Sequence, residues 1–139
     1  MPTVSLPWWN STPDLTNGQE INDEFKAKFG VDMNGHSAES YTVVWIFKTA
    51  IEAAGTTDGE AVRDALKNLD IQGEFPGGRK IVLPYDRIKF EDYDLAGAPH
   101  YRDNTYASVA IAQVQDGTWK TVWPFSFTDT QILYPAPLQ

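Results

Sequence analysis

The apolar residues that precede Gly55 follow a helical pattern with an unusually wide apolar face. Over residues 37–55 the polar positions form only a narrow stripe, made of Thr42, Lys48, Thr49 and Glu52. A surface helix normally buries about a third to a half of its circumference. We therefore predict a long helix that is covered on more than one side. Its N-terminus, with unpaired amides and a positive dipole, is the best place in the chain for a small polar ligand.

Two shorter helices are predicted on either side of this one. Apolar residues recur at every fourth position over residues 18–29, which indicates a helix. Thr57 and Glu60 have the spacing of a capping box and predict a third helix over about 58–69. Short links join the three helices, so the first half of the chain is predicted to be mainly helical.

The remaining segments are typical of strands and loops. Residues 3–6 can form a short strand, and residues 80–83 and 87–90 are predicted as short strands around a turn. The acidic and then Gly- and Pro-containing stretch 91–104 is predicted to be a long crossing loop.

A β-hairpin is predicted around Asp116-Gly117, because this dipeptide adopts the positive φ angles of a two-residue turn. The expected strands cover residues 105–115 and 118–123. Apolar side chains alternate onto both faces of the first strand, and a two-stranded hairpin alone is marginally stable. We therefore predict that a second copy of the chain covers it, with hairpins or tails exchanged in a homo-oligomer.

Composition narrows the class of protein. The chain has 139 residues, 42% of them hydrophobic and 22% charged, which is typical of one globular domain. The net charge of −8 argues against nucleic acid as a partner, and the absence of cysteine excludes disulfides and thiol catalysis. No apolar run reaches the roughly 18–20 residues of a membrane span, and no signal peptide is recognised. The chain is therefore either cytosolic or the inner part of a longer exported protein.

The side chains that could catalyse a reaction or bind a metal do not form a catalytic pattern. His36 and His100 are the only histidines, and neither has the spacing of a metal ligand. The acidic run at 91–94 is better explained as a solvated loop than as a cation site, and Trp8-Trp9 as packing rather than ligand stacking. We therefore expect no enzyme, no metal and no cofactor, with an acidic hydrolase as the least favoured alternative.

The order of several motifs carries more information than any single one. The set comprises Phe25–Gly30, Ser40-Tyr41 opening a long helix that ends at Gly55, Asp58–Leu66, Gly78–Phe90, Val109–Gly117 and Thr121–Pro124. In this order and spacing, residues 3–124 resemble the C-terminal portion of type I periplasmic binding proteins. The resemblance is to the branched-chain amino-acid (Leu/Ile/Val) receptors of ABC importers.

This resemblance implies an α/β fold, with a partial lobe of three main helices, short crossing strands and a C-terminal β-hairpin. Residues 1–104 would form a partial first lobe with crossing segments, including crossings at 3–9 and 97–104. Residues 105–139 would be a hairpin and tail that belong to the second lobe. Because a complete receptor is more than twice this length, the chain would be a piece of a receptor.

The resemblance also implies a ligand site and a role. In the family the segment before the helix-opening Tyr reaches the ligand, which corresponds to His36, Ser37 and Ala38, with Ser40 and Tyr41 in support. The ligand would be an amino acid, an amide or a small aromatic acid, presented to an ABC permease. The full-length protein would be periplasmic and without catalysis of its own. The alternative is an oligomerising interaction module that has lost ligand capture.

Overall fold

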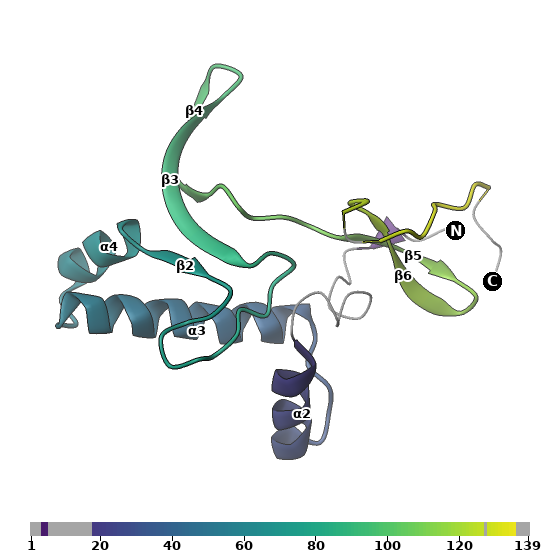
Figure 1. The fold of residues 1–139 in the computed structure, drawn as a ribbon, viewed down its shortest axis with the longest axis horizontal. Coiled ribbons are helices and arrows are strands. Elements are labelled where there is room, and N and C mark those ends of the chain that lie inside the picture. The colour runs from purple at the N-terminus through teal and green to yellow at the C-terminus, as the bar shows by residue number, and fades with distance from the viewer. Residues whose placement is uncertain (1–3, 6–17, 127, 136–139) are drawn as a thin grey trace.

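The computed structural model describes residues 4–5, 18–126 and 128–135 (Figure 1). Its elements are β1 (Val4–Ser5), α2 (Gly18–Phe29), α3 (Gly35–Ala54), α4 (Gly59–Lys67), β2 (Asp70–Gln72), β3 (Arg87–Leu95), β4 (Ala98–Asn104), β5 (Ile111–Gln115) and β6 (Thr118–Trp123). The strands form two antiparallel three-stranded sheets, with the orders β2-β3-β4 and β1-β5-β6. The predicted α/β class, with three helices and a C-terminal hairpin, is confirmed.

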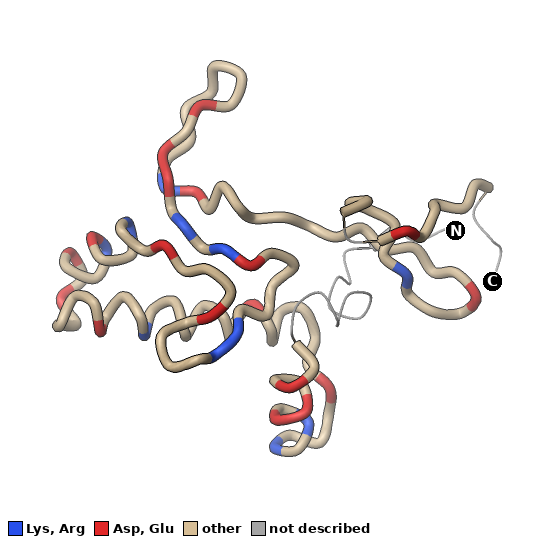
Figure 2. Tube along the Cα trace, in the orientation of Figure 1, with Lys and Arg blue, Asp and Glu red and all other residues tan. Residues whose placement is uncertain are grey.

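The elements form two groups. In Figure 1 the three helices lie with β2, β3 and β4, whereas β1, β5 and β6 lie at the other end of the molecule. Residues 105–110 connect the two groups as an extended segment that carries no charged side chain (Figure 2). The predicted strand at 3–6 is present only as the short β1, and the Trp8-Trp9 pair lies outside the described residues.

Helix ends follow local capping chemistry. Residues 18–29 form α2 as predicted. Helix α3 begins at Gly35 instead of near Ser37, because Asn34 is the N-cap and its Oδ1 accepts a hydrogen bond from the Ser37 amide at 2.9 Å. Gly55 ends α3 in the left-handed region at φ 65°, as its position after the apolar run predicts.

The predicted capping box of the third helix is wrong. Asp58, not Thr57, is the N-cap of α4, and its Oδ1 accepts a hydrogen bond from the Ala61 amide at 3.0 Å. Asp58 is one residue closer to the first turn, and a carboxylate there also meets the positive end of the helix dipole.

The core lies between α3, α4 and the first sheet. Phe75, Ile88 and Val82 are its largest fully buried side chains. Residues 80–83 contribute to it but do not form the predicted strand, since Lys80 and Leu83 make only isolated bridges. Their three consecutive apolar side chains are all buried, so the segment lacks the alternation of a strand with one exposed face.

Helix α3 is packed on one side only. Ala38, Thr42, Thr49 and Ala50 are buried, and Trp45 stacks on Phe75 with ring centroids 6.1 Å apart. The exposed apolar face of α3 consists of Val43, Val44, Phe47 and Ile51, which are between 36% and 66% exposed. The prediction that α3 is covered on more than one side is therefore wrong for the single chain, because α4 and the sheet approach the same side.

The predicted crossing loop at 91–104 is also wrong. It is the distal part of a hairpin formed by β3 and β4, which curves away from the helices in Figure 1. Its turn is Ala96-Gly97, with φ angles of 54° and 85°, and Asp94 Oδ1 accepts a hydrogen bond from the Gly97 amide at 2.7 Å. Alanine seldom adopts positive φ, so this turn has a weak sequence signal.

The second hairpin confirms the Asp116-Gly117 turn, whose φ angles are 52° and 74°. Its first strand begins at Ile111 and not at residue 105. Ala112 and Gln113 point to opposite faces and both are buried, so the hairpin is covered on both sides.

The segment 128–135, called the tail below, covers part of this second hairpin. Gln113 Oε1 accepts a hydrogen bond from the Leu133 amide at 2.9 Å, and Gln113 Nε2 donates one to the Leu133 carbonyl at 3.0 Å. Gln115 Nε2 donates to the Gln131 carbonyl at 2.9 Å. Part of the cover expected from a second copy is thus supplied here within one chain, and the homo-oligomer stays a prediction.

Candidate functional site

The start of α3 presents the five predicted ligand residues in three directions. His36 and Ser40 are one helical turn apart and both are exposed. The His36 side chain is 96% exposed, and its Nδ1 lies 3.3 Å from Glu39 Oε2. Ala38 points the opposite way, into the core, and is fully buried.

Ser37 and Tyr41 form a second stripe, which is half-buried. The Ser37 hydroxyl donates to Asn34 Oδ1 at 3.1 Å, so the capping Asn34 binds both the amide and the hydroxyl of Ser37. The Tyr41 ring lies 6.3 Å from Trp45. Its buried hydroxyl makes no hydrogen bond of normal geometry within the described residues. Burial raises the pKa of Tyr41, and the nearby Trp45 side chain opposes this in part.

An ion pair between α2 and the loop before residue 80 lies near Tyr41. Arg79 Nη1 is 2.9 Å from both carboxylate oxygens of Glu24, and these hydrogen bonds raise the pKa of Arg79. The charges of both residues also act on the pKa of Tyr41. Sequence reasoning missed this pair, since residues 55 positions apart give no local signal of contact.

The structure therefore brings together Ser37 and Tyr41, and separately His36 and Ser40, while it turns Ala38 away from both. The Tyr41 hydroxyl is a buried polar group that could pair with a ligand, because leaving such a group unpaired is unfavourable. The role of all five residues in ligand binding stays a prediction.

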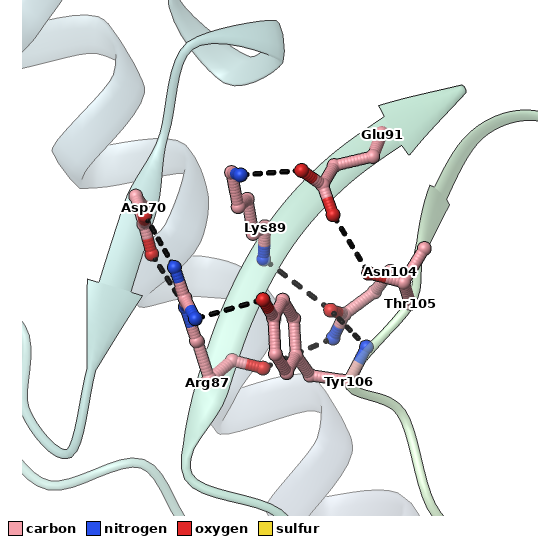
Figure 3. Close-up of polar contacts among 7 residues, drawn as sticks. All are labelled: Asp70, Arg87, Lys89, Glu91, Asn104, Thr105 and Tyr106. Atoms are coloured by element: carbon pink, nitrogen blue, oxygen red, sulfur yellow. Dashed lines mark hydrogen bonds and ion pairs between the residues drawn. The ribbon is translucent and has the colours of Figure 1, made fainter. Parts of the chain in front are cut away.

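A second polar cluster surrounds the base of the β3–β4 hairpin (Figure 3). Arg87 binds Asp70 through two nitrogens, each 2.8 Å from a different carboxylate oxygen. It also donates to the Tyr106 hydroxyl at 2.8 Å and lies 4.2 Å from the centre of that ring. Hydrogen bonding to Arg87 lowers the pKa of Asp70.

The same cluster continues along β3. Lys89 pairs with Glu91, which also accepts a hydrogen bond from the Thr105 hydroxyl at 2.9 Å, and together these bonds lower the pKa of Glu91. The Asn104 side chain bonds the backbone of Arg87 and Lys89, at 3.3 Å each. Every charge in this cluster has a partner, so its chemistry is that of a clamp that holds residues 104–106 on β3.

The acidic run 91–94, interpreted from the sequence as a solvated loop, lies on β3, and three of its four acidic or aromatic side chains accept hydrogen bonds within the hairpin. Besides Glu91, the Asp92 carboxylate accepts from the Arg102 amide at 2.9 Å, and Asp94 caps the hairpin turn. In the parts of the chain that the structure describes, no group of three or more His, Cys, Asp or Glu side chains could hold a metal ion. Along the described residues, Lys and Arg positions are scattered among acidic ones and form no basic stripe (Figure 2).

Residues 2–99 match the periplasmic binding protein family, and this match covers most of the chain. The chain belongs to that family. The match includes all three helices, and with them the start of α3. It ends inside β4, so β5 and β6 lie beyond it. No curated protein matches the chain.

Membership of the family assigns the chain to the solute-binding proteins of ABC transport, which take a small ligand and work with an ABC transporter. Proteins of this family are typically not enzymes. None of the helices among the described residues is long and apolar enough to cross a membrane.

Proposed function

We propose that the chain is the C-terminal portion of a solute-binding protein of the branched-chain amino-acid receptor type. Its ligand is an amino acid, an amide or a small aromatic acid, delivered to an ABC permease in the periplasm. The observation that carries the proposal is the family match over residues 2–99, which contains the whole of α3.

The start of α3 is the part of the chain that meets this ligand. Tyr41 is half-buried and its hydroxyl makes no hydrogen bond of normal geometry among the described residues, and Ser37 lies beside it on the same stripe. His36 extends into solvent one residue away, where it can contact a ligand held against Ser37 and Tyr41. A histidine suits a polar, carboxylate-bearing or aromatic ligand better than an aliphatic one.

The two groups of elements support a division into parts of two lobes. Residues 1–104 belong to the first lobe, and residues 105–139 contribute a hairpin and tail to the second. The uncharged segment 105–110 is the connection between them. In this arrangement the ligand is held where the lobes face each other.

A thermal-shift screen with amino acids and aromatic acids tests the site. We expect the ligand-induced rise in melting temperature to fall by at least half in His36→Ala and Tyr41→Phe. Gln72→Ala is the control, since it removes an exposed polar side chain on β2 that belongs to neither candidate site, and it should keep the full rise. An unchanged rise in both α3 variants would remove the start of α3 from the site.

The alternative function is an oligomerising interaction module. One observation favours it: the apolar face of α3 is exposed, and nothing among the described residues covers it. Light scattering on the purified chain separates the two functions. A monomer at micromolar concentration would eliminate the oligomer, whereas a dimer that shows no ligand response in the screen would favour the alternative.

A further inference from the structure

The β3–β4 hairpin carries an irregularity at Arg102. Glu91 pairs with Asp103 and Tyr93 with His100, so β4 has one more residue than β3 between these two pairs. Such a bulge changes the direction of a side chain relative to the regular strand, and bulges are frequent next to functional sites. Here the bulge lies at residues 101–102.

Arg102 adopts a backbone conformation that is unfavourable for arginine. Its φ angle is 58°, in the left-handed region, and its amide is fixed by a hydrogen bond to Asp92 Oδ1 at 2.9 Å. A residue other than glycine persists in this region only when its surroundings hold it there. The fold therefore maintains a strained arginine where glycine would be the unstrained choice.

The guanidinium of Arg102 is unpaired within the described residues. Arg63, Arg79 and Arg87 each form an ion pair with a carboxylate, at 2.8–2.9 Å. Arg102 forms none, although the chain carries a net charge of −8. Asp103, its neighbour, is directed to His100 Nδ1 at 3.0 Å.

Arg102 borders an open depression of about 760 Å³. Its lining residues are Phe90, Tyr93, Arg102, Asp103, Asn104, Thr105 and Ala107. Asn104 and Thr105 already use their polar groups in the clamp at the base of the hairpin. Phe90 and Tyr93 are half-buried, because Phe90 packs on the core and Tyr93 stacks on His100 with ring centroids 4.8 Å apart. The depression therefore combines one free cation with the parts of two rings that stay exposed.

We propose that this depression is a binding site for a small carboxylate with an aromatic body. The Arg102 guanidinium would bind the carboxylate with two parallel hydrogen bonds, since its fork matches that group. The Phe90 and Tyr93 rings would pack against the body of the ligand. The site does not depend on the proposed function, because it shares no residue with the start of α3.

The test is an NMR titration of the full 139-residue chain with benzoate, followed on backbone amides. We expect saturable shifts confined to residues 90–107. Arg102→Gly should weaken binding at least tenfold, while its melting temperature stays equal to or above that of the parent, because glycine accepts positive φ without steric strain. Arg63→Gln, which removes an exposed arginine on α4, should leave benzoate affinity unchanged.

Benzamide and inorganic phosphate test which part of the ligand is recognised. Benzamide keeps the ring without the charge and should bind at least tenfold more weakly than benzoate, as should phosphate. Equal binding of benzamide, preferred binding of phosphate, or unchanged affinity in Arg102→Gly would overturn the proposal. Shifts at residues 36–41 instead of the hairpin would also overturn it, while supporting the start of α3 as the ligand site.

Discussion

The two hairpins of this chain close with the same kind of turn but are stabilised in different ways. Ala96-Gly97 and Asp116-Gly117 both have two consecutive positive φ angles. The β3–β4 hairpin extends into solvent and is held at its base by ion pairs and by Asn104. The β5–β6 hairpin is buried on both faces and is held by apolar packing and by two glutamine amides.

This difference indicates how much stability a substitution in each hairpin should cost. Exposed ion pairs contribute little to stability individually and are screened by salt. Buried apolar side chains and buried amides contribute more, because their removal leaves a cavity or an unpaired polar group. Substitutions in β5–β6 should therefore lower stability more than equivalent substitutions in β3–β4.

The largest expected effect comes from a charge placed in each hairpin. Val122 is 1% exposed on β6, and Val122→Asp should lower the free energy of unfolding by more than about 3 kcal/mol, because the carboxylate loses its hydration. Tyr101 is 69% exposed on β4, and Tyr101→Asp should lower it by less than about 1 kcal/mol. Urea denaturation measures both, and equal losses would contradict the contrast between the hairpins.

The second largest effect is expected from the glutamine side chains that bind the tail. Gln113→Ala removes both side-chain bonds to Leu133 and should lower the free energy of unfolding by about 1–3 kcal/mol. Hydrogen exchange should show that the Leu133 amide loses its protection. Gln72→Ala, at an exposed position on β2, is the control and should change stability by less than about 0.5 kcal/mol. If Leu133 keeps its protection in Gln113→Ala, the tail is held by other contacts.

The two turn glycines give a smaller and differently distributed effect. Gly97→Ala and Gly117→Ala each place a Cβ at positive φ, with a local cost of about 1–2 kcal/mol and no steric neighbour within 4 Å. Gly117→Ala should lower the global free energy of unfolding, because β5–β6 is packed on both faces. Gly97→Ala should only increase hydrogen exchange near the tip of β3–β4. A global loss from Gly97→Ala would show that this tip unfolds together with the core.

Acid should have the smallest effect, and within the two hairpins it should act at the base of β3–β4. The pKa values of Asp70 and Glu91 are lowered in the folded chain, so their stabilising contribution is present above the unfolded-state pKa values near 4. This contribution is lost as the pH falls through the lower folded-state values. We expect the amides of Lys89 and Tyr106 to exchange faster relative to the core below about pH 4. Asp70→Asn should show the same increase already at pH 7.

Local sequence signals predicted the elements whose cause is local. The period of the apolar residues gave α2 with its observed bounds, and Gly55 and Asp116-Gly117 marked positions that need positive φ. The capping of α4 shifted by one residue because Thr57 and Asp58 are both competent acceptors. The Ala96-Gly97 turn was missed because alanine does not favour the conformation that the hairpin imposes on it.

The candidate sites were less accessible from the sequence. The order of the motifs predicted a ligand site at the start of α3. It did not predict that Ala38 faces the core while His36 faces solvent. The Glu24–Arg79 pair and the free guanidinium of Arg102 depend on which distant residues become neighbours. Sequence spacing carries no information about such contacts.

The sequence alone determined the three helices, the second hairpin and the family to which the chain belongs, because periodicity, turn chemistry and motif order are local and ordered along the chain. Only the tertiary structure decided that α3 leaves an apolar face exposed and that residues 91–104 form a curved hairpin. It also decided that the tail lies on Gln113 and Gln115. These features follow from the packing of segments far apart in the sequence, where side-chain burial and pairing outweigh local preference.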